Sequence, residues 1–145
     1  MTRAELQALA ERYLETWRRR DPVSIAGFHA IDGVVESPIY ATLRGRKAIE
    51  DASRAFFTSF PDATLEEVDA IIIDPPQGAI FTTVNATHKN DFFGMPGTNR
   101  HIEFRNARLV LWDEQGLIAH ERRIYDFTGL LVQLGVLRAK PAKPL

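Results

Sequence analysis

Residues 101–112 read HIEFRNARLVLW, and this stretch decides the fold. Apolar residues such as Ile102 and Val110 alternate with polar ones, which is typical of a strand with one buried face. Asn106 and Arg108 nevertheless fall on the apolar side of the alternation. The middle of this strand is therefore predicted to direct polar side chains toward the interior.

A second strand with the same irregularity follows the turn DEQG. Residues 117–126 read LIAHERRIYD, and Ala119 and Tyr125 define one face that is interrupted by Glu121 and Arg123. Burying a charge costs several kcal/mol unless it is paired or solvated. The two strands therefore predict either an internal ion-pair network or a wet cavity.

The remaining chain places helices before strands. Apolar residues at three- and four-residue spacing predict helices over residues 3–20, 23–28, 45–60 and 127–134. Alternation predicts strands over residues 33–40, 64–74, 78–90, 100–112 and 117–126. This order predicts an α+β domain in which a curved antiparallel sheet wraps around the N-terminal helices.

Length and composition narrow the classes of protein. A chain of 145 residues fits one domain, which we expect over residues 1–137, followed by a frayed Pro/Lys/Ala-rich tail over 138–145. The net charge of −1 argues against a nucleic-acid or membrane-surface partner, because both require a basic excess. The N-terminal 20 residues are amphipathic and do not resemble a signal peptide, so we expect a cytoplasmic location.

Cysteine and histidine, the usual ligands of transition metals, are scarce in this chain. The chain has no cysteine, which excludes disulfides, thiol nucleophiles and thiolate metal sites. Its four histidines show no ligand spacing, so no metal site is expected.

Three segments carry a family resemblance. The segments Phe93 to Arg100 (FGMPGTNR), Asp126 to Gly129 (DFTG) and Gln133 to Gly135 (QLG), together with the order of helices and strands from about Glu5 to Gly135, resemble the SnoaL-like polyketide cyclases of the NTF2-like superfamily. The resemblance implies an NTF2-like, cystatin-like cone, an α+β barrel with an interior pocket. It also implies a homodimer that works without a cofactor. Enzymes of this family close a ring by an intramolecular aldol reaction, with an aspartate as acid and base.

The catalytic positions of the family carry other residues here. The cyclase aspartate falls on Arg123, its supporting histidine on Arg108, the neighbouring glutamine on Asn106, and an asparagine of the first strand on Ser37. The resemblance therefore implies the fold and the place of the pocket, whereas the cyclase chemistry is not carried over residue by residue.

Two other enzyme classes of the superfamily match less well. Ketosteroid isomerases resemble the chain at Tyr13, but their base aspartate falls on Ser37 and their protonated aspartic acid on Arg108. Limonene epoxide hydrolases need an Arg-x-Asp pair on one strand and an aspartate near Arg123, and neither is evident. Both activities are disfavoured.

We expect a pocket between the N-terminal helix and the sheet. Its candidate catalytic residues are Glu121, Arg123 and Arg108. Its candidate substrate-binding residues are Tyr13, Trp17, Ser37, Phe56, His88 and Asn106.

The charged cluster has two interpretations. It is a neutralised network that serves packing only, or it is a ligand site, because two guanidiniums against one carboxylate leave one positive charge for a carboxylate or enolate oxygen. The sequence thus favours an enzyme that performs acid/base chemistry by cyclisation, isomerisation or hydrolysis. Its substrate would be an apolar molecule with a keto, ester or carboxylate group. The alternative is a non-catalytic ligand-binding relative.

The strand residues that alternate with the inward-facing ones predict an interface. Phe81, Leu109, Leu111 and Ile124 would form an apolar patch on the outer face of the sheet. We therefore expect a homodimer through this face.

Overall fold

The computed structural model describes residues 1–138, in which four helices and six strands form one α+β unit. The helices are α1 (Arg3–Arg18), α2 (Pro22–Gly27), α3 (Arg46–Ser59) and α4 (Phe127–Gln133). The strands are β1 (His29–Ser37), β2 (Ala41–Arg44), β3 (Thr64–Asp74), β4 (Gln77–Thr87), β5 (His101–Trp112) and β6 (Ile118–Ile124). The tail expected over residues 138–145 lies outside the described residues apart from Arg138. No helix within residues 1–138 is long and apolar enough to span a lipid bilayer.

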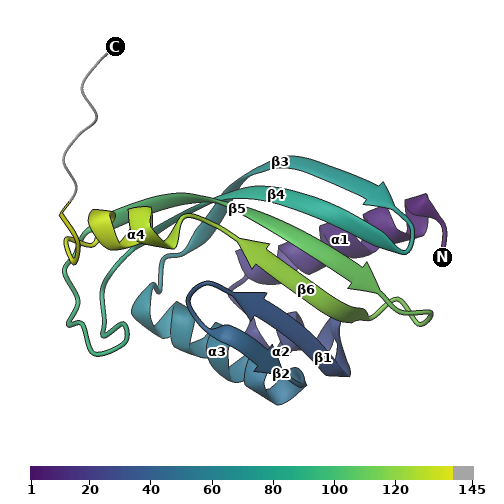
Figure 1. Ribbon diagram of the computed structural model, residues 1–145, viewed down its shortest axis with the longest axis horizontal. Coiled ribbons are helices and arrows are strands. Elements are labelled where there is room, and N and C mark those ends of the chain that lie inside the picture. The colour runs from purple at the N-terminus through teal and green to yellow at the C-terminus, as the bar shows by residue number, and fades with distance from the viewer. Residues whose placement is uncertain (139–145) are drawn as a thin grey trace, which may run out of the picture.

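The strands form one sheet in the order β2-β1-β6-β5-β4-β3. Strands β3 to β6 are the predicted antiparallel meander, whereas β1 pairs with β6 in parallel. Figure 1 shows that the sheet is strongly curved and stays open. The predicted α+β fold is confirmed, with an unclosed sheet in place of a complete barrel.

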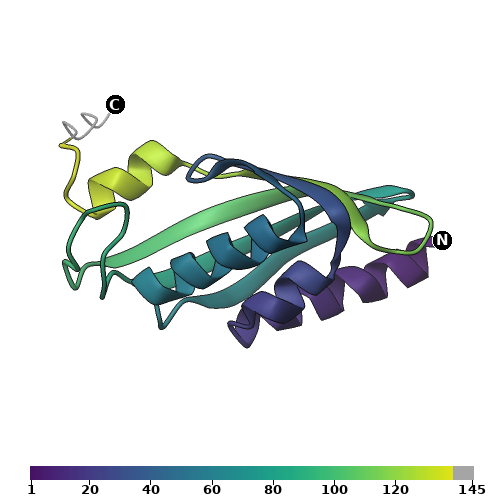
Figure 2. The same ribbon diagram turned by 90° about the horizontal axis from the view of Figure 1, so that it is seen from below.

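Helices α1, α2 and α3 lie together against one face of the sheet (Figure 2). The inward residues of the strands and the apolar stripe of α1 form the main core, in which Leu6, Leu14, Ile80, Ile102 and Val110 are almost fully buried. The inner face of β5 belongs to this core, so the polar residues in its middle are enclosed as the alternation predicts.

The predicted alternation of inward-facing and outward-facing residues is wrong at the start of β6. Ile118 pairs with Trp112 and His120 with Leu111, so Ala119 is an extra residue at a bulge. Ile118 is fully buried there, and Ala119 is only half-buried. The predicted alternation resumes beyond the bulge, and Glu121 and Arg123 face the interior.

Two elements at the start of the sheet differ from the predicted boundaries. Strand β1 begins at His29, four residues before the predicted strand, because it continues directly from α2 into pairing with β6. The short strand β2 was not predicted. Its first residue, Ala41, has a φ of 56°, which allows the tight reversal that returns the chain along β1.

Asp126, the first residue of the DFTG segment, caps α4. Its Oδ1 accepts a hydrogen bond from the Gly129 backbone N–H at 2.8 Å. The cap fixes the start of a helix whose one fully buried residue is Leu130.

We predict that Asp126→Ala lowers the free energy of unfolding by about 1 kcal/mol, because one orphan N–H group of α4 loses its acceptor. Urea unfolding followed by circular dichroism measures this change. Asp126→Asn keeps an acceptor oxygen and should retain most of the stability. Equal losses in the two variants would contradict the capping role.

Candidate functional site

Two arginines oppose one another directly on the inner face of the sheet. Arg108 of β5 and Arg123 of β6 are paired in the antiparallel register. Their exposed fractions are 2% and 9%. Like charges directly opposite on neighbouring strands repel, and burial strengthens the repulsion. The pair therefore requires a negative partner.

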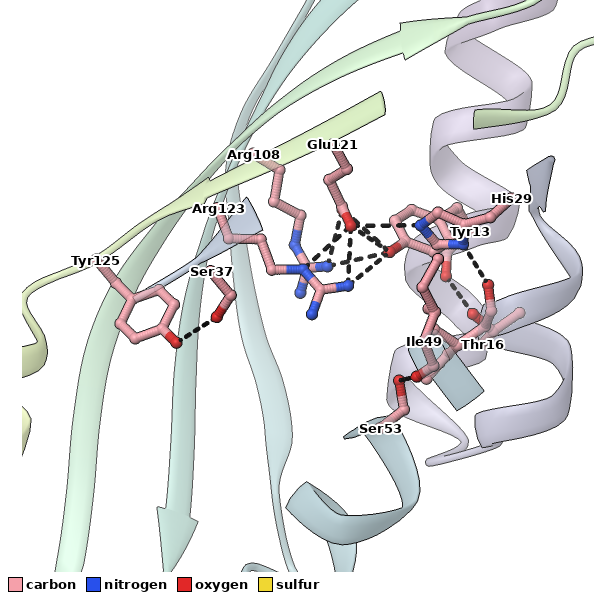
Figure 3. Close-up of polar contacts among 11 residues, drawn as sticks. Tyr13, Thr16, His29, Ser37, Ile49, Ser53, Arg108, Glu121, Arg123 and Tyr125 are labelled. Carbon is pink, nitrogen blue, oxygen red and sulfur yellow. Dashed lines mark hydrogen bonds and ion pairs between the residues drawn. The ribbon is translucent and has the colours of Figure 1, made fainter. Parts of the chain in front are cut away.

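Glu121 supplies that partner from the same face of β6. Its Oε2 accepts hydrogen bonds from Arg123 Nη2 at 2.8 Å and Nε at 3.1 Å. Its Oε1 lies 3.3 Å from Arg108 Nη1. The carboxylate is fully buried, so one negative charge holds both guanidiniums in place (Figure 3).

Two further groups tie Glu121 to the helical layer. The Tyr13 hydroxyl of α1 donates to Glu121 Oε1 at 3.0 Å. His29 Nε2 lies 3.4 Å from Glu121 Oε2, while its Nδ1 lies 3.0 Å from the carbonyl oxygen of Ile25 in α2. The carboxylate therefore joins the sheet to α1 through Tyr13 and to α2 through His29, and Figure 3 shows its contacts with Tyr13 and His29.

These contacts determine the charge state of Glu121. Burial opposes ionisation, but Arg123, the hydrogen bond from His29 and Arg108 outweigh it and hold the pKa of Glu121 well below its ordinary value of 4.5. Burial also raises the pKa of Tyr13, and the Glu121 charge adds to this effect. Glu121 is a fixed anion near neutral pH, surrounded by donors.

Trp17 of α1 completes the surroundings of the arginines. The Arg108 Cζ atom lies 4.4 Å from the centroid of the Trp17 ring, and the Arg123 Cζ atom lies 5.0 Å from it. Both distances are within the range of a cation–π interaction. The indole thus orients the guanidiniums as well as forming part of a wall.

A pocket opens beside this cluster. Its wall combines residues of the helices with the inner face of the sheet. Six of the residues expected from the sequence line it: Trp17, Ser37, Phe56, Asn106, Arg108 and Arg123. Helix α3 contributes a second aromatic side chain, Phe57.

Three expected residues do not line the pocket. Tyr13 and Glu121 lie behind the arginines in the buried network. His88 is fully buried elsewhere, where it packs against Phe60 and its Nδ1 lies 3.0 Å from Thr98 Oγ1. His88 follows the last residue of β4, and this position lies beyond the pocket.

The pocket also contains residues that the sequence did not single out. Tyr40, Phe104 and Tyr125 line it, and the Tyr125 hydroxyl lies 2.9 Å from Ser37 Oγ. Burial raises the pKa of Tyr40 to about 12 and also raises the pKa of Tyr125. Alternation placed Tyr125 on the inner face, but nothing in the sequence distinguished it from a core residue.

Several polar atoms of the pocket wall lack a partner. Within residues 1–138, Trp17 Nε1, Arg108 Nε and Asn106 Oδ1 are buried without a hydrogen bond. Unpaired buried polar atoms are rare and costly. All three atoms belong to residues that line the pocket.

The site can stabilise negative charge. Two guanidiniums against one carboxylate leave one positive charge beside an apolar pocket, where water screens it weakly. Among the described residues, no group of three or more His, Asp or Glu side chains is placed to hold a metal ion.

We predict that Glu121→Gln lowers the free energy of unfolding by about 3 kcal/mol or more near neutral pH, because it leaves two buried guanidiniums without a counter-charge. The folded-state pKa is depressed, so the contribution of Glu121 is present above its ordinary value of 4.5 and is lost as pH falls toward the folded-state pKa. Urea unfolding across acidic pH should therefore show the difference between wild type and variant shrinking.

Glu36→Gln is the matched control for this prediction. Glu36 pairs with Arg122 and His120 on the exposed side of the sheet, and its loss should have a much smaller effect. A pH-independent difference between wild type and Glu121→Gln would contradict an ionised Glu121.

Comparison with solved structures finds the same fold in several proteins. AclR, a candidate hydroxylase from Streptomyces galilaeus, is 25% identical with a TM-score of 0.82, covering 97% of this chain and 91% of its own. TsrD from Streptomyces laurentii is 23% identical with a TM-score of 0.81, and the match covers 94% of this chain and 99% of TsrD. IdmH, a candidate polyketide cyclase from Streptomyces antibioticus, is 23% identical with a TM-score of 0.75, covering 90% and 99%.

A search of curated protein sequences finds no match. The model of the SnoaL-like polyketide cyclase family, in contrast, matches residues 7–134. This range extends from α1 to the end of α4 and contains every residue of the charged network and the pocket wall. The chain belongs to the SnoaL-like polyketide cyclase family.

Proposed function

We propose that this protein is a cofactor-independent enzyme that binds a flat apolar molecule and stabilises negative charge on its keto, ester or carboxylate oxygen. Cyclisation, isomerisation and hydrolysis all build up such a charge. Arg108 and Arg123 are the catalytic residues in this proposal, and Glu121 is a positioning residue that holds them.

One observation carries the proposal: two buried arginines face an aromatic pocket and, among the described residues, share one carboxylate. Two guanidiniums against one carboxylate leave one positive charge at the pocket wall. Both arginines line the pocket, and this supports the proposal that the surplus charge meets a substrate oxygen.

The second candidate function is ligand binding without catalysis. It is favoured by the pocket wall, which contains no Asp, Glu or His among the described residues. The depressed pKa of Glu121 adds support, since a proton-transfer group works best with a pKa near the working pH. Both functions use the same pocket, and they differ in whether the arginines polarise the bound carbonyl group.

We predict that a bound aromatic ketone such as 2-acetylnaphthalene shows a carbonyl stretch at lower wavenumber than in water, because the arginines polarise its C=O bond. Isotope-edited infrared spectroscopy of the carbon-13 ketone measures this shift. Arg123→Met should remove most of it and weaken binding at least tenfold.

Arg122→Met is the control. Arg122 precedes Arg123 on β6 but is exposed, and its partner is Glu36. This variant should bind and shift the carbonyl stretch as wild type does. Binding without a shift in wild type would support the non-catalytic function, and no binding would overturn both.

We also propose that the protein is a cytoplasmic homodimer that pairs through the outer face of the sheet. Phe81, Leu109, Leu111 and Ile124 are all exposed there, at 39% to 57%. Phe81 and Ile124 lie in one row across the strands with Ala107 between them. Such a patch is typical of an interface.

We expect sedimentation velocity at micromolar concentration to give the mass of two chains. Ile124→Glu should shift the mass to one chain, because it buries a charge in the proposed interface. Val23→Glu replaces an exposed apolar residue of α2 and should leave the dimer intact. A monomeric wild type would contradict the proposal.

A further inference from the structure

We propose that the pocket accepts its substrate as an organic oxyanion: the conjugate base of a phenol or of an enolised 1,3-dicarbonyl compound, with the charged oxygen against Arg108 and Arg123. This inference rests on the proposed function and specifies the substrate class of the same site. Three independent features of the site carry it.

The first feature is the set of unused donors around the surplus charge. Arg108 forms its hydrogen bonds within residues 1–138 through Nη1, to Tyr13 and Glu121, while its Nε is buried without a partner. Trp17 Nε1 is a second buried donor without a partner in the same part of the chain. Both residues line the pocket. An oxyanion accepts hydrogen bonds and carries the one negative charge that the network lacks.

The second feature is the lack of a base. The wall contains no carboxylate and no imidazole among the described residues, and its titratable groups other than the arginines are Tyr40 and Tyr125. Burial raises the pKa of both tyrosines, so neither is ionised near neutral pH. Glu121 lies behind the arginines, and its two oxygens already accept hydrogen bonds.

A consequence for the substrate follows. A site without a base does not remove a proton from a weakly acidic ketone. The substrate must therefore lose its proton in water before it binds. Enolised 1,3-dicarbonyl compounds, and phenols that carry a conjugated electron-withdrawing group, can do so near neutral pH, because conjugation delocalises the resulting charge.

The third feature is the shape and chemistry of the wall. Trp17, Phe56, Phe104 and Tyr125 surround the pocket with flat aromatic rings. Such rings stack on a planar conjugated body and exclude water from it. A conjugated oxyanion has both a planar body and a negative charge. It therefore matches the aromatic wall and the arginines at once.

The test uses 4-nitrophenol, whose ionised form is coloured. An absorbance titration of the probe with saturating wild-type protein gives the pKa of the bound phenol. We expect this pKa to lie at least one unit below that of the free phenol, which corresponds to at least tenfold tighter binding of the anion. Its neutral isostere, 4-nitroanisole, should bind at least tenfold more weakly than the phenolate.

Variants assign the effect to the arginines. Arg108→Met and Arg123→Met should each reduce the pKa shift, whereas Arg122→Met on the exposed side of β6 should keep it. If either buried-site variant fails to fold, Trp17→Phe provides a milder change. It removes the unpartnered Nε1 donor and should reduce the shift in part.

Three outcomes would overturn the inference. If phenolate and 4-nitroanisole bind equally with no pKa shift, anion selection is absent, while the pocket and the proposed function survive. If the shift persists in both arginine variants or disappears at high salt, the anion binds elsewhere on the surface. If neither probe nor 2-acetylnaphthalene binds to folded protein, the inference and the proposed function both fail.

Discussion

A single buried carboxylate between two opposed arginines is the constraint on which this molecule depends. The register of β5 and β6 places Arg108 and Arg123 side by side, and without Glu121 the two charges would repel in a poorly screened interior. The same carboxylate accepts a hydrogen bond from the Tyr13 hydroxyl of α1 and contacts His29 at the start of β1. One side chain thus fixes the geometry of the pocket wall and the seating of the helices on the sheet.

The residues at the positions that the resemblance assigns to catalysis differ in charge from those of the family. An arginine occupies the place that the resemblance assigns to the cyclase aspartate, so a proton-transfer group has been replaced by a permanent cation. Although burial opposes the charged form, Glu121 and Tyr13 raise the pKa of Arg123 above its ordinary value. In the proposed function, the site therefore acts by electrostatic stabilisation at a position that the resemblance assigns to proton transfer.

Much of this could be predicted from the sequence, because alternation on β5 and β6 reveals which side chains face inward. Asn106, Arg108, Glu121 and Arg123 were identified in this way, and all four are buried. His29 was not identified as a member of the network. Its role depends on the parallel pairing of β1 with β6, which joins segments far apart in the chain and leaves no local pattern.

The pocket wall and the charged network draw on different elements, and this has a consequence for protein engineering. Helix α3 supplies Phe56 and Phe57 to the pocket wall, whereas the side chains that hold the charge come from α1, β1, β5 and β6. A library randomised at Phe57 would also disturb the charged network, because the Phe57 ring lies 5.6 Å from the Trp17 ring, which contacts both guanidiniums. Phe56 has no such contact with Trp17 among the aromatic pairs of the described residues, so it is the better position at which to reshape the cavity while leaving its charge unchanged.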